Sequence, residues 1–115
     1  MISNTLYAKY ILEREGLRII ENESAFLTYK ITDRECFIAN MFVDWSKRNA
    51  GNGRALIEEL MKVAEDCDVI TANIWMWDPN ANKTLQAALA TGFVVAHAAD
   101  GVLLISKKLK ESRNG

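Results

Sequence analysis

The segment Phe37-Ile38-Ala39-Asn40-Met41-Phe42-Val43, followed by the turn Arg48-Asn49-Ala50-Gly51-Asn52-Gly53, decides the fold of this chain. The first segment is apolar, too short for a stable helix and rich in aromatic and branched side chains, which predicts a β-strand. After the turn, apolar residues recur every three or four positions from Leu56 to Cys67, which predicts a helix that begins at the glycines. Such a turn suits an anion, because the unpaired amides of a helix's first turn point toward it.

The composition indicates one domain covering residues 1–115, long enough to form a hydrophobic core. Half of the residues are apolar, no apolar run approaches the roughly 18 residues of a membrane span, and no signal peptide is recognisable, so we expect a soluble, cytoplasmic protein. The net charge of -1 gives no reason to expect nucleic acid or a membrane as partner. Cys36 and Cys67 lack metal-ligand spacing, so we expect buried free thiols and no metal site.

The chain before the central strand predicts a helix followed by an antiparallel meander. Residues Asn4–Glu15 have the spacing of an amphipathic helix, and Gly16 follows where helices commonly stop. The apolar face of this helix is formed by Leu6, Tyr7, Tyr10 and Ile11. Leu17–Glu21 and Ala25–Ile31 flank a turn-prone trio and predict a hairpin, after which the strand Cys36–Val43 follows.

The chain after the glycine turn predicts a helix, a strand, a second helix and a closing hairpin. The strand Val69–Trp77 follows a helical crossover, which makes it parallel to the strand Cys36–Val43. A last helix from about Asn82 to Thr91 precedes the hairpin strands Val94–His97 and Val102–Ser106. The predicted fold class is therefore α/β with a mixed sheet, in the order α-β-β-β-α-β-α-β-β.

The glycine turn does not fit two common phosphate-binding motifs. A nucleoside triphosphatase loop needs a lysine followed by serine or threonine in register with the glycines, and none is present. A dinucleotide-binding turn needs a third glycine where this chain has Leu56. What remains is the pattern R-x-x-G-x-G, preceded by Val43-Asp44-Trp45 and followed, after the next helix, by Gly92-Phe93.

With these residues the chain resembles the GNAT family of N-acyltransferases. The resemblance covers roughly Phe37–Ser106 and includes the order of the elements as well as the motif. It implies a GNAT-like fold, acetyl coenzyme A as co-substrate and an amine as acceptor. The alternative is that Gly51 and Gly53 only begin a helix after a loop.

The resemblance also implies which residues hold the coenzyme. In the family, the glycine turn and a nearby arginine bind the pyrophosphate, while the strand before it pairs with pantetheine and polarises the thioester carbonyl. An asparagine after the next strand commonly touches the pantetheine, and here either candidate could instead be a helix cap. The residues assigned in this way are Met41, Phe42, Val43, Arg48, Asn49, Ala50, Gly51, Asn52, Gly53, Arg54, Asn80 and Asn82.

The catalytic residues are less clearly indicated. Many relatives protonate the leaving thiolate with a tyrosine about four residues before the Gly-Phe pair, where this chain has Ala88. The candidate bases are Asp44, at the end of the central strand, and His97, the only histidine. Aspartate is also common in turns and a lone strand histidine is usually structural, so both residues have ordinary alternatives.

Two functions remain open from the sequence. The first is an acetyl-coenzyme-A-dependent N-acetyltransferase that acts on a small-molecule or protein amine. The second, motivated by the missing tyrosine and a short N-terminal part, is a GNAT-like binding or interaction module without catalysis, of the compact kind expected in a virus or mobile element. The short N-terminal part also predicts a shallow acceptor pocket or one completed by a second subunit in a homodimer.

Overall fold

The computed structural model describes residues 4–44 and 51–109, and its elements follow the predicted order. These elements are α1 (Leu6–Glu15), β1 (Arg18–Glu21), β2 (Ala25–Thr32), β3 (Glu35–Val43), α2 (Asn52–Val63), β4 (Val69–Trp75), α3 (Ala81–Ala90), β5 (Val94–Ala99) and β6 (Val102–Lys108). The six strands form one sheet in the order β1-β2-β3-β4-β6-β5, in which β3 and β4 are parallel and the other neighbours antiparallel. The prediction of a mixed α/β sheet is confirmed.

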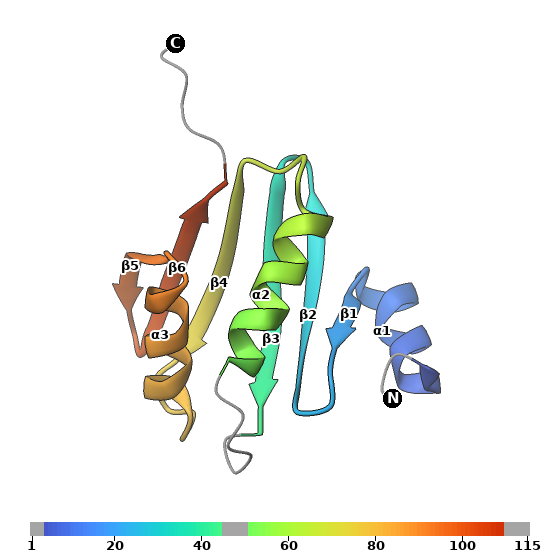
Figure 1. Cartoon of the computed structure of the whole chain (residues 1–115), viewed down its shortest axis with the longest axis horizontal. Coiled ribbons are helices and arrows are strands. Elements are labelled where there is room, and N and C mark those ends of the chain that lie inside the picture. Colours follow the sequence, from blue (N-terminus) through green and yellow to red (C-terminus); the bar gives the residue numbers. More distant parts are fainter. Residues whose placement is uncertain (1–3, 45–50, 110–115) are drawn as a thin grey trace.

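Helices α2 and α3 lie side by side on the same face of the sheet (Figure 1). The core lies between them and the strands, and its fully buried side chains include Leu27, Leu56, Leu60 and Ile70. Helix α2 ends at Val63, earlier than the apolar pattern to Cys67 suggested. Both cysteines are nevertheless buried and free, as predicted. None of the described helices is long and apolar enough to cross a membrane.

Helix α1 forms as predicted but buries little of its apolar face. Thr5 caps it through a hydrogen bond from the Ala8 amide (3.2 Å), and Gly16 ends it in the left-handed region at φ 70°. Of the four residues predicted to face the core, only Ile11 is buried. The other three are exposed because α1 lies beyond the edge strand β1, and not over the sheet (Figure 1).

Strand β4 ends at Trp75, two residues before the predicted end at Trp77. The chain turns at this point because the amide of Asp78 donates to the Trp75 carbonyl (2.9 Å) and the amide of Met76 donates to the Gly101 carbonyl (2.8 Å). The two indole rings lie 6.5 Å apart, and Trp75 is 46% and Trp77 77% exposed. The prediction that this strand continues to Trp77 is therefore wrong, and neither tryptophan is buried.

Candidate functional site

The candidate site starts at a β-bulge in β3. Thr28 pairs with Asn40 and Tyr29 with Ile38, so Ala39 is the extra residue on β3. Because strand side chains alternate, the extra residue shifts which positions face the helices: Ile38 before the bulge, and Met41 and Val43 after it. A single inserted residue thus turns the end of β3 toward the start of α2.

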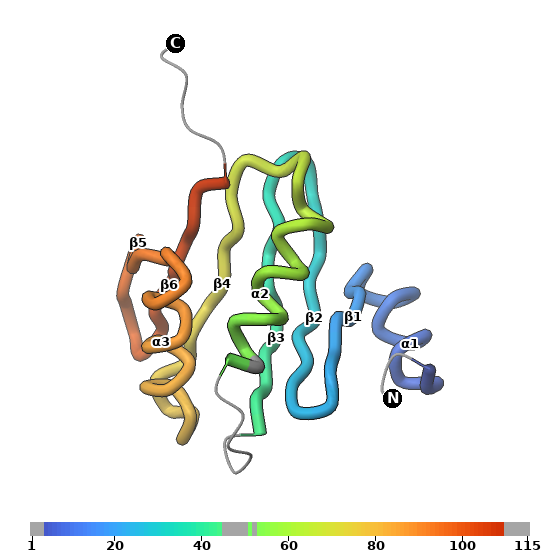
Figure 2. The backbone as a smooth tube through the Cα atoms, viewed as in Figure 1, coloured from blue at the N-terminus to red at the C-terminus, as the bar shows by residue number. Residues whose placement is uncertain are grey.

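Strands β3 and β4 separate just after this bulge. Their parallel pairing runs from Glu35↔Val69 to Ile38↔Ala72 and continues no further along the described strands. Figure 2 shows the two strands diverging toward the end where α2 begins. Beyond Ile38, β3 pairs only with β2, and β4 only with β6, so each has one edge of backbone groups facing the gap.

The direction of the backbone groups at this gap follows from two hydrogen bonds. The Asp44 amide donates to Ser24 on the β2 side (2.8 Å), so by alternation the backbone groups of Phe42 also face β2, while those of Met41 and Val43 face the gap. On β4, the Asp68 carbonyl accepts from the Leu109 amide on the β6 side (2.8 Å). The same alternation turns the backbone groups of Asn73 toward the gap.

The gap opens into a cleft with a cavity volume of about 110 Å³ between the two strands and helices α2 and α3. Its apolar walls come from Ile38, Ala39, Met41, Val43, Ile57, Ala72, Ile74, Trp75, Ala81, Ala87, Ala88, Phe93 and Ile105. Polar lining residues are Asn40, Asn73, Asp78 and Thr84. A narrow, mostly apolar cleft with a few polar groups and unpaired strand edges suits an elongated ligand that carries amides.

The N-terminus of α2 lies at one end of this cleft and has a glycine as its N-cap. This residue is Gly51, at φ 98°, which has no side chain to bond the first-turn amides. No acidic residue stands in the first turn. Arg54 lies in this turn with its guanidinium 3.4 Å from the Glu58 carboxylate, and both side chains are more than half exposed. A helix start with a glycine N-cap beside an arginine favours an anion there.

The two glycines of the turn have different structural roles. Gly51 adopts a left-handed conformation in open space, with nothing within 4 Å of where a Cβ would be. Gly53 has an ordinary helical conformation, but its Cβ would lie 3.2 Å from Met41 Cε and 3.3 Å from Val43 Cγ2. The first glycine therefore allows the turn, and the second allows α2 to approach β3.

The structure distributes the predicted coenzyme residues unevenly around the cleft. Met41, Val43 and Gly53 line it, whereas the ring of Phe42 lies on the opposite face of the sheet, 6.0 Å from the ring of Phe26. Arg48, Asn49 and Ala50 lie outside the described residues, and Asn52 begins α2.

Of the two candidate asparagines, neither lines the cleft. Asn80 takes the N-cap position of α3 without a side-chain capping bond, and Asn82 is exposed in the first turn. Asp78 lines the cleft instead, and its carboxylate accepts a hydrogen bond from the Asn80 amide (2.8 Å). Sequence reasoning missed Asp78 and Thr84. The signal for Thr84 was its spacing of four residues from Ala88 on one helix face.

The two candidate bases lie away from the cleft lining. His97 is exposed on the edge strand β5, which β6 separates from β4. Asp44 lies just after β3 beside a second, open pocket that it shares with the β1–β2 turn, including Glu21 and Glu23. The rings of Phe26 and Phe42 form the apolar side of this pocket.

Comparison with protein-family models gives no match, and no curated protein sequence matches the chain. Solved structures do match. The PaiA N-acetyltransferase of Thermoplasma acidophilum, in complex with coenzyme A, aligns with a TM-score of 0.65 at 14% identity, over 74% of this chain and 53% of that one. A protein of Desulfovibrio desulfuricans assigned to the GNAT family of acetyltransferases aligns at 0.65 and 14% identity, over 79% and 66% of the two chains. The fold is the GNAT fold.

A third GNAT-fold structure covers more of the chain. The ribosomal-protein-S18-alanine N-acetyltransferase of Escherichia coli aligns with a TM-score of 0.66 at 18% identity, over 92% of this chain and 79% of that one. The chain spans about half the length of the PaiA enzyme. Identities this low show a shared fold, and in this GNAT fold the cleft lies at the separation of β3 and β4.

Within the GNAT fold, one departure stands in the cleft itself. Ala88 is 9% exposed and lines the cleft from α3, in the position where the resemblance led us to look for a tyrosine. Its neighbour one turn earlier, Thr84, is the hydroxyl-bearing residue on that wall. The described cleft lining therefore contains no phenol, and its ionisable side chain is Asp78.

Proposed function

We propose that this protein is an N-acetyltransferase that uses acetyl coenzyme A and an amine acceptor. The observation that carries the proposal is the separation of β3 from β4 beyond Ile38↔Ala72, which exposes strand-edge backbone groups along an apolar cleft. The start of α2, with its glycine N-cap, at one end of the same cleft supports it. The match to a GNAT-fold enzyme in complex with coenzyme A agrees with this assignment.

The residues present fit the chemical parts of this coenzyme. The first-turn amides of α2 would hold the pyrophosphate, with Arg54 supplying positive charge once it turns from Glu58. The backbone groups of Met41 and Val43 would pair with the pantetheine amides in the manner of an added strand. The bound coenzyme supplies an acyl thioester, which is activated toward attack by a neutral amine.

The chain's own contribution to the reaction is positioning and electrostatic stabilisation. An amide of Met41 or Val43, which faces the gap, would donate to the carbonyl oxygen as negative charge develops there. The amine would arrive from the pocket beside Asp44, where carboxylates and two aromatic rings suit a cationic group. Asp44 would then accept the proton that the ammonium loses before attack.

Isothermal titration calorimetry with acetyl coenzyme A tests the binding step. We expect binding that Arg54→Gln weakens about tenfold, because a charge-assisted contact to phosphate is lost. Lys62→Gln, at the other end of α2, is the matched control and should leave the affinity unchanged. Absence of binding at millimolar ligand would remove the proposal.

A thiol-release assay with an amine panel tests the transfer step. The second candidate function is a binding module that holds coenzyme A without catalysis, and Ala88 on the cleft wall favours it. If the protein binds acetyl coenzyme A and releases thiol with at least one amine, the result supports an N-acetyltransferase. If it binds acetyl coenzyme A and releases no thiol with any amine, the result supports a binding module.

A further inference from the structure

One face of the sheet lacks a covering layer in the described chain. Both α2 and α3 pack on the other face, and α1 lies beyond the β1 edge (Figure 1). We call the uncovered side the open face. Strand alternation places Trp75 and Val94 on it, and these residues are 46% and 58% exposed. Trp77 stacks beside Trp75 at its margin.

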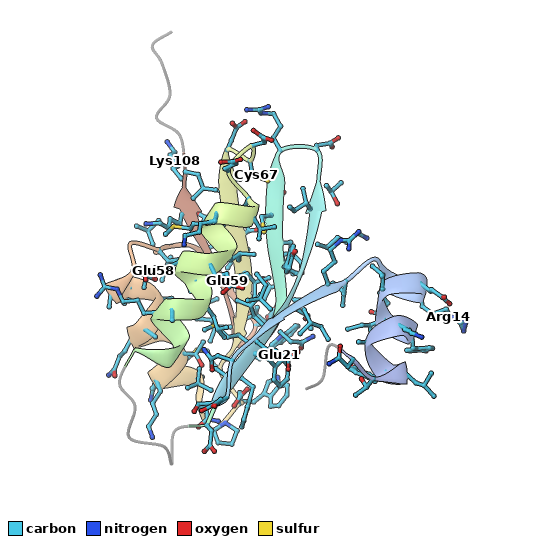
Figure 3. All side chains as sticks on the ribbon, turned by 45° about the vertical axis from the view of Figure 1, so that its right-hand side comes forward. Arg14, Glu21, Glu58, Glu59, Cys67 and Lys108 are labelled. Atoms are coloured by element: carbon cyan, nitrogen blue, oxygen red, sulfur yellow. The ribbon has the colours of Figure 1, made fainter. Side chains whose placement is uncertain are left out.

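Helix α1 carries a second apolar surface without a partner. Leu6 is 81%, Tyr7 60% and Tyr10 53% exposed, and the three residues adjoin one another at helical spacing. Figure 3 shows α1, with Arg14 on it, at the edge of the sheet and apart from the other two helices. Three large apolar side chains projecting from one isolated helix are the usual mark of a docking surface.

The helix does not cover the open face of its own chain in this structure. Only Gly16 and Leu17 join α1 to β1, and the Leu17 amide donates to the Ile11 carbonyl (3.2 Å). Strand β4, which carries Trp75, is three strand spacings from β1, a distance of about 14 Å. The helix is thus held at the β1 edge, projecting away from its own sheet.

We propose that two copies of this chain form a two-fold symmetric dimer in which α1 of each copy lies across the open face of the other. Each copy then donates one apolar surface and accepts one, so the contact is self-complementary and closes at two. With aromatic side chains of about 150–250 Å² each, the exposed parts of the residues on the two surfaces amount to on the order of 800 Å² per copy, about the ~800 Å² per partner of a standard interface. These residues are Leu6, Tyr7, Tyr10, Trp75, Trp77 and Val94.

Sedimentation equilibrium of the full chain at micromolar concentration tests the proposal. We expect a mass twice the 12.9 kDa of one chain. Tyr10→Glu on the helix and Trp75→Glu on the open face should each shift the mass to that of one chain. Leu89→Glu is the matched control, because Leu89 is 48% exposed on α3 and away from both surfaces. Circular dichroism checks that every variant remains folded.

Cysteine cross-linking distinguishes a dimer in which α1 of each copy lies on the open face of the other from dimers with a different interface. A mixture of Tyr10→Cys and Trp75→Cys chains should form a disulfide-linked pair on mild oxidation, and neither variant should form it alone. Cys36 and Cys67 are buried and do not interfere. A monomer at all concentrations overturns the proposal, as does a dimer that Trp75→Glu breaks but Tyr10→Glu leaves intact, since the sheet faces would then pair without the helix.

Discussion

Gly53 and Met41 are packed against each other so closely that a Cβ on residue 53 would lie 3.2 Å from Met41 Cε. This contact sets how near α2 comes to the end of β3, and therefore the width of the cleft between them. Val43 Cγ2, at 3.3 Å from the same point, completes the contact. The second glycine of the turn is thus required by packing, in addition to any part in ligand binding.

Gly53→Leu should lower the free energy of unfolding by about 2 kcal/mol, because a large side chain overfills this contact. Urea denaturation measures the change. In a double-mutant cycle, Met41→Ala should relieve part of the loss in the Gly53→Leu chain. The comparison variant is Gly51→Ala, which should cost about 1 kcal/mol through its backbone alone and show no coupling to Met41. If Met41→Ala showed the same coupling energy with Gly51→Ala as with Gly53→Leu, the result would contradict the contact between Gly53 and Met41.

Ala88→Tyr should raise the rate of acetyl transfer about tenfold or more if the chain is an acetyltransferase. The reason is that the phenol would stand on the cleft wall and protonate the leaving thiolate. Steady-state kinetics checks this, with an increase expected in kcat and not in the KM for the thioester. Ala88→Phe controls for the added volume and should give no increase. A gain from the phenylalanine variant would point to packing and not to acid catalysis.

Lys107→Met should destabilise the protein by about 1–2 kcal/mol. The Lys107 ammonium donates to the Thr91 carbonyl (2.7 Å) at the C-terminus of α3, where a positive charge also interacts favourably with the helix dipole. Thermal and urea unfolding give the loss. Lys108→Met, one residue further along β6 and exposed, should change stability by less than about 0.5 kcal/mol. Similar losses for both lysines would exclude the capping role.

Stability should fall as the pH rises above about 9. Burial, followed by the nearby Cys67 and Glu35, raises the pKa of the Cys36 thiol from 9.0 to about 12. Between these values the unfolded chain loses a proton that the folded chain keeps, so unfolding becomes easier by up to about 1.4 kcal/mol per pH unit. Urea denaturation at pH 8 to 11 measures the slope. Cys36→Ala should reduce the slope most, whereas Cys67→Ala should leave most of the Cys36 contribution in place, because burial is the larger cause of the raised pKa.

Local sequence signals predicted the order and the kind of every element. Hydrophobic spacing and the glycines at positions 16, 51, 92 and 101 mark where helices and turns begin and end, and these signals are local. The sequence also identified the strand, glycine turn and helix that border the cleft. The end of β4 was wrongly predicted at Trp77. This end depends on a hydrogen bond from the Met76 amide to the carbonyl of Gly101, which is distant in sequence.

Which faces of the sheet are covered, and where β3 and β4 separate, depends on contacts between segments that are distant in the sequence. The Ala39 bulge depends on the pairing register with β2, and no residue pattern in β3 alone reveals an extra residue. In the same way, the apolar spacing of α1 predicts a buried face but does not say which surface buries it. The two-residue link to β1 places that helix at the sheet edge, so no other described helix or strand covers its exposed tyrosines or the open face.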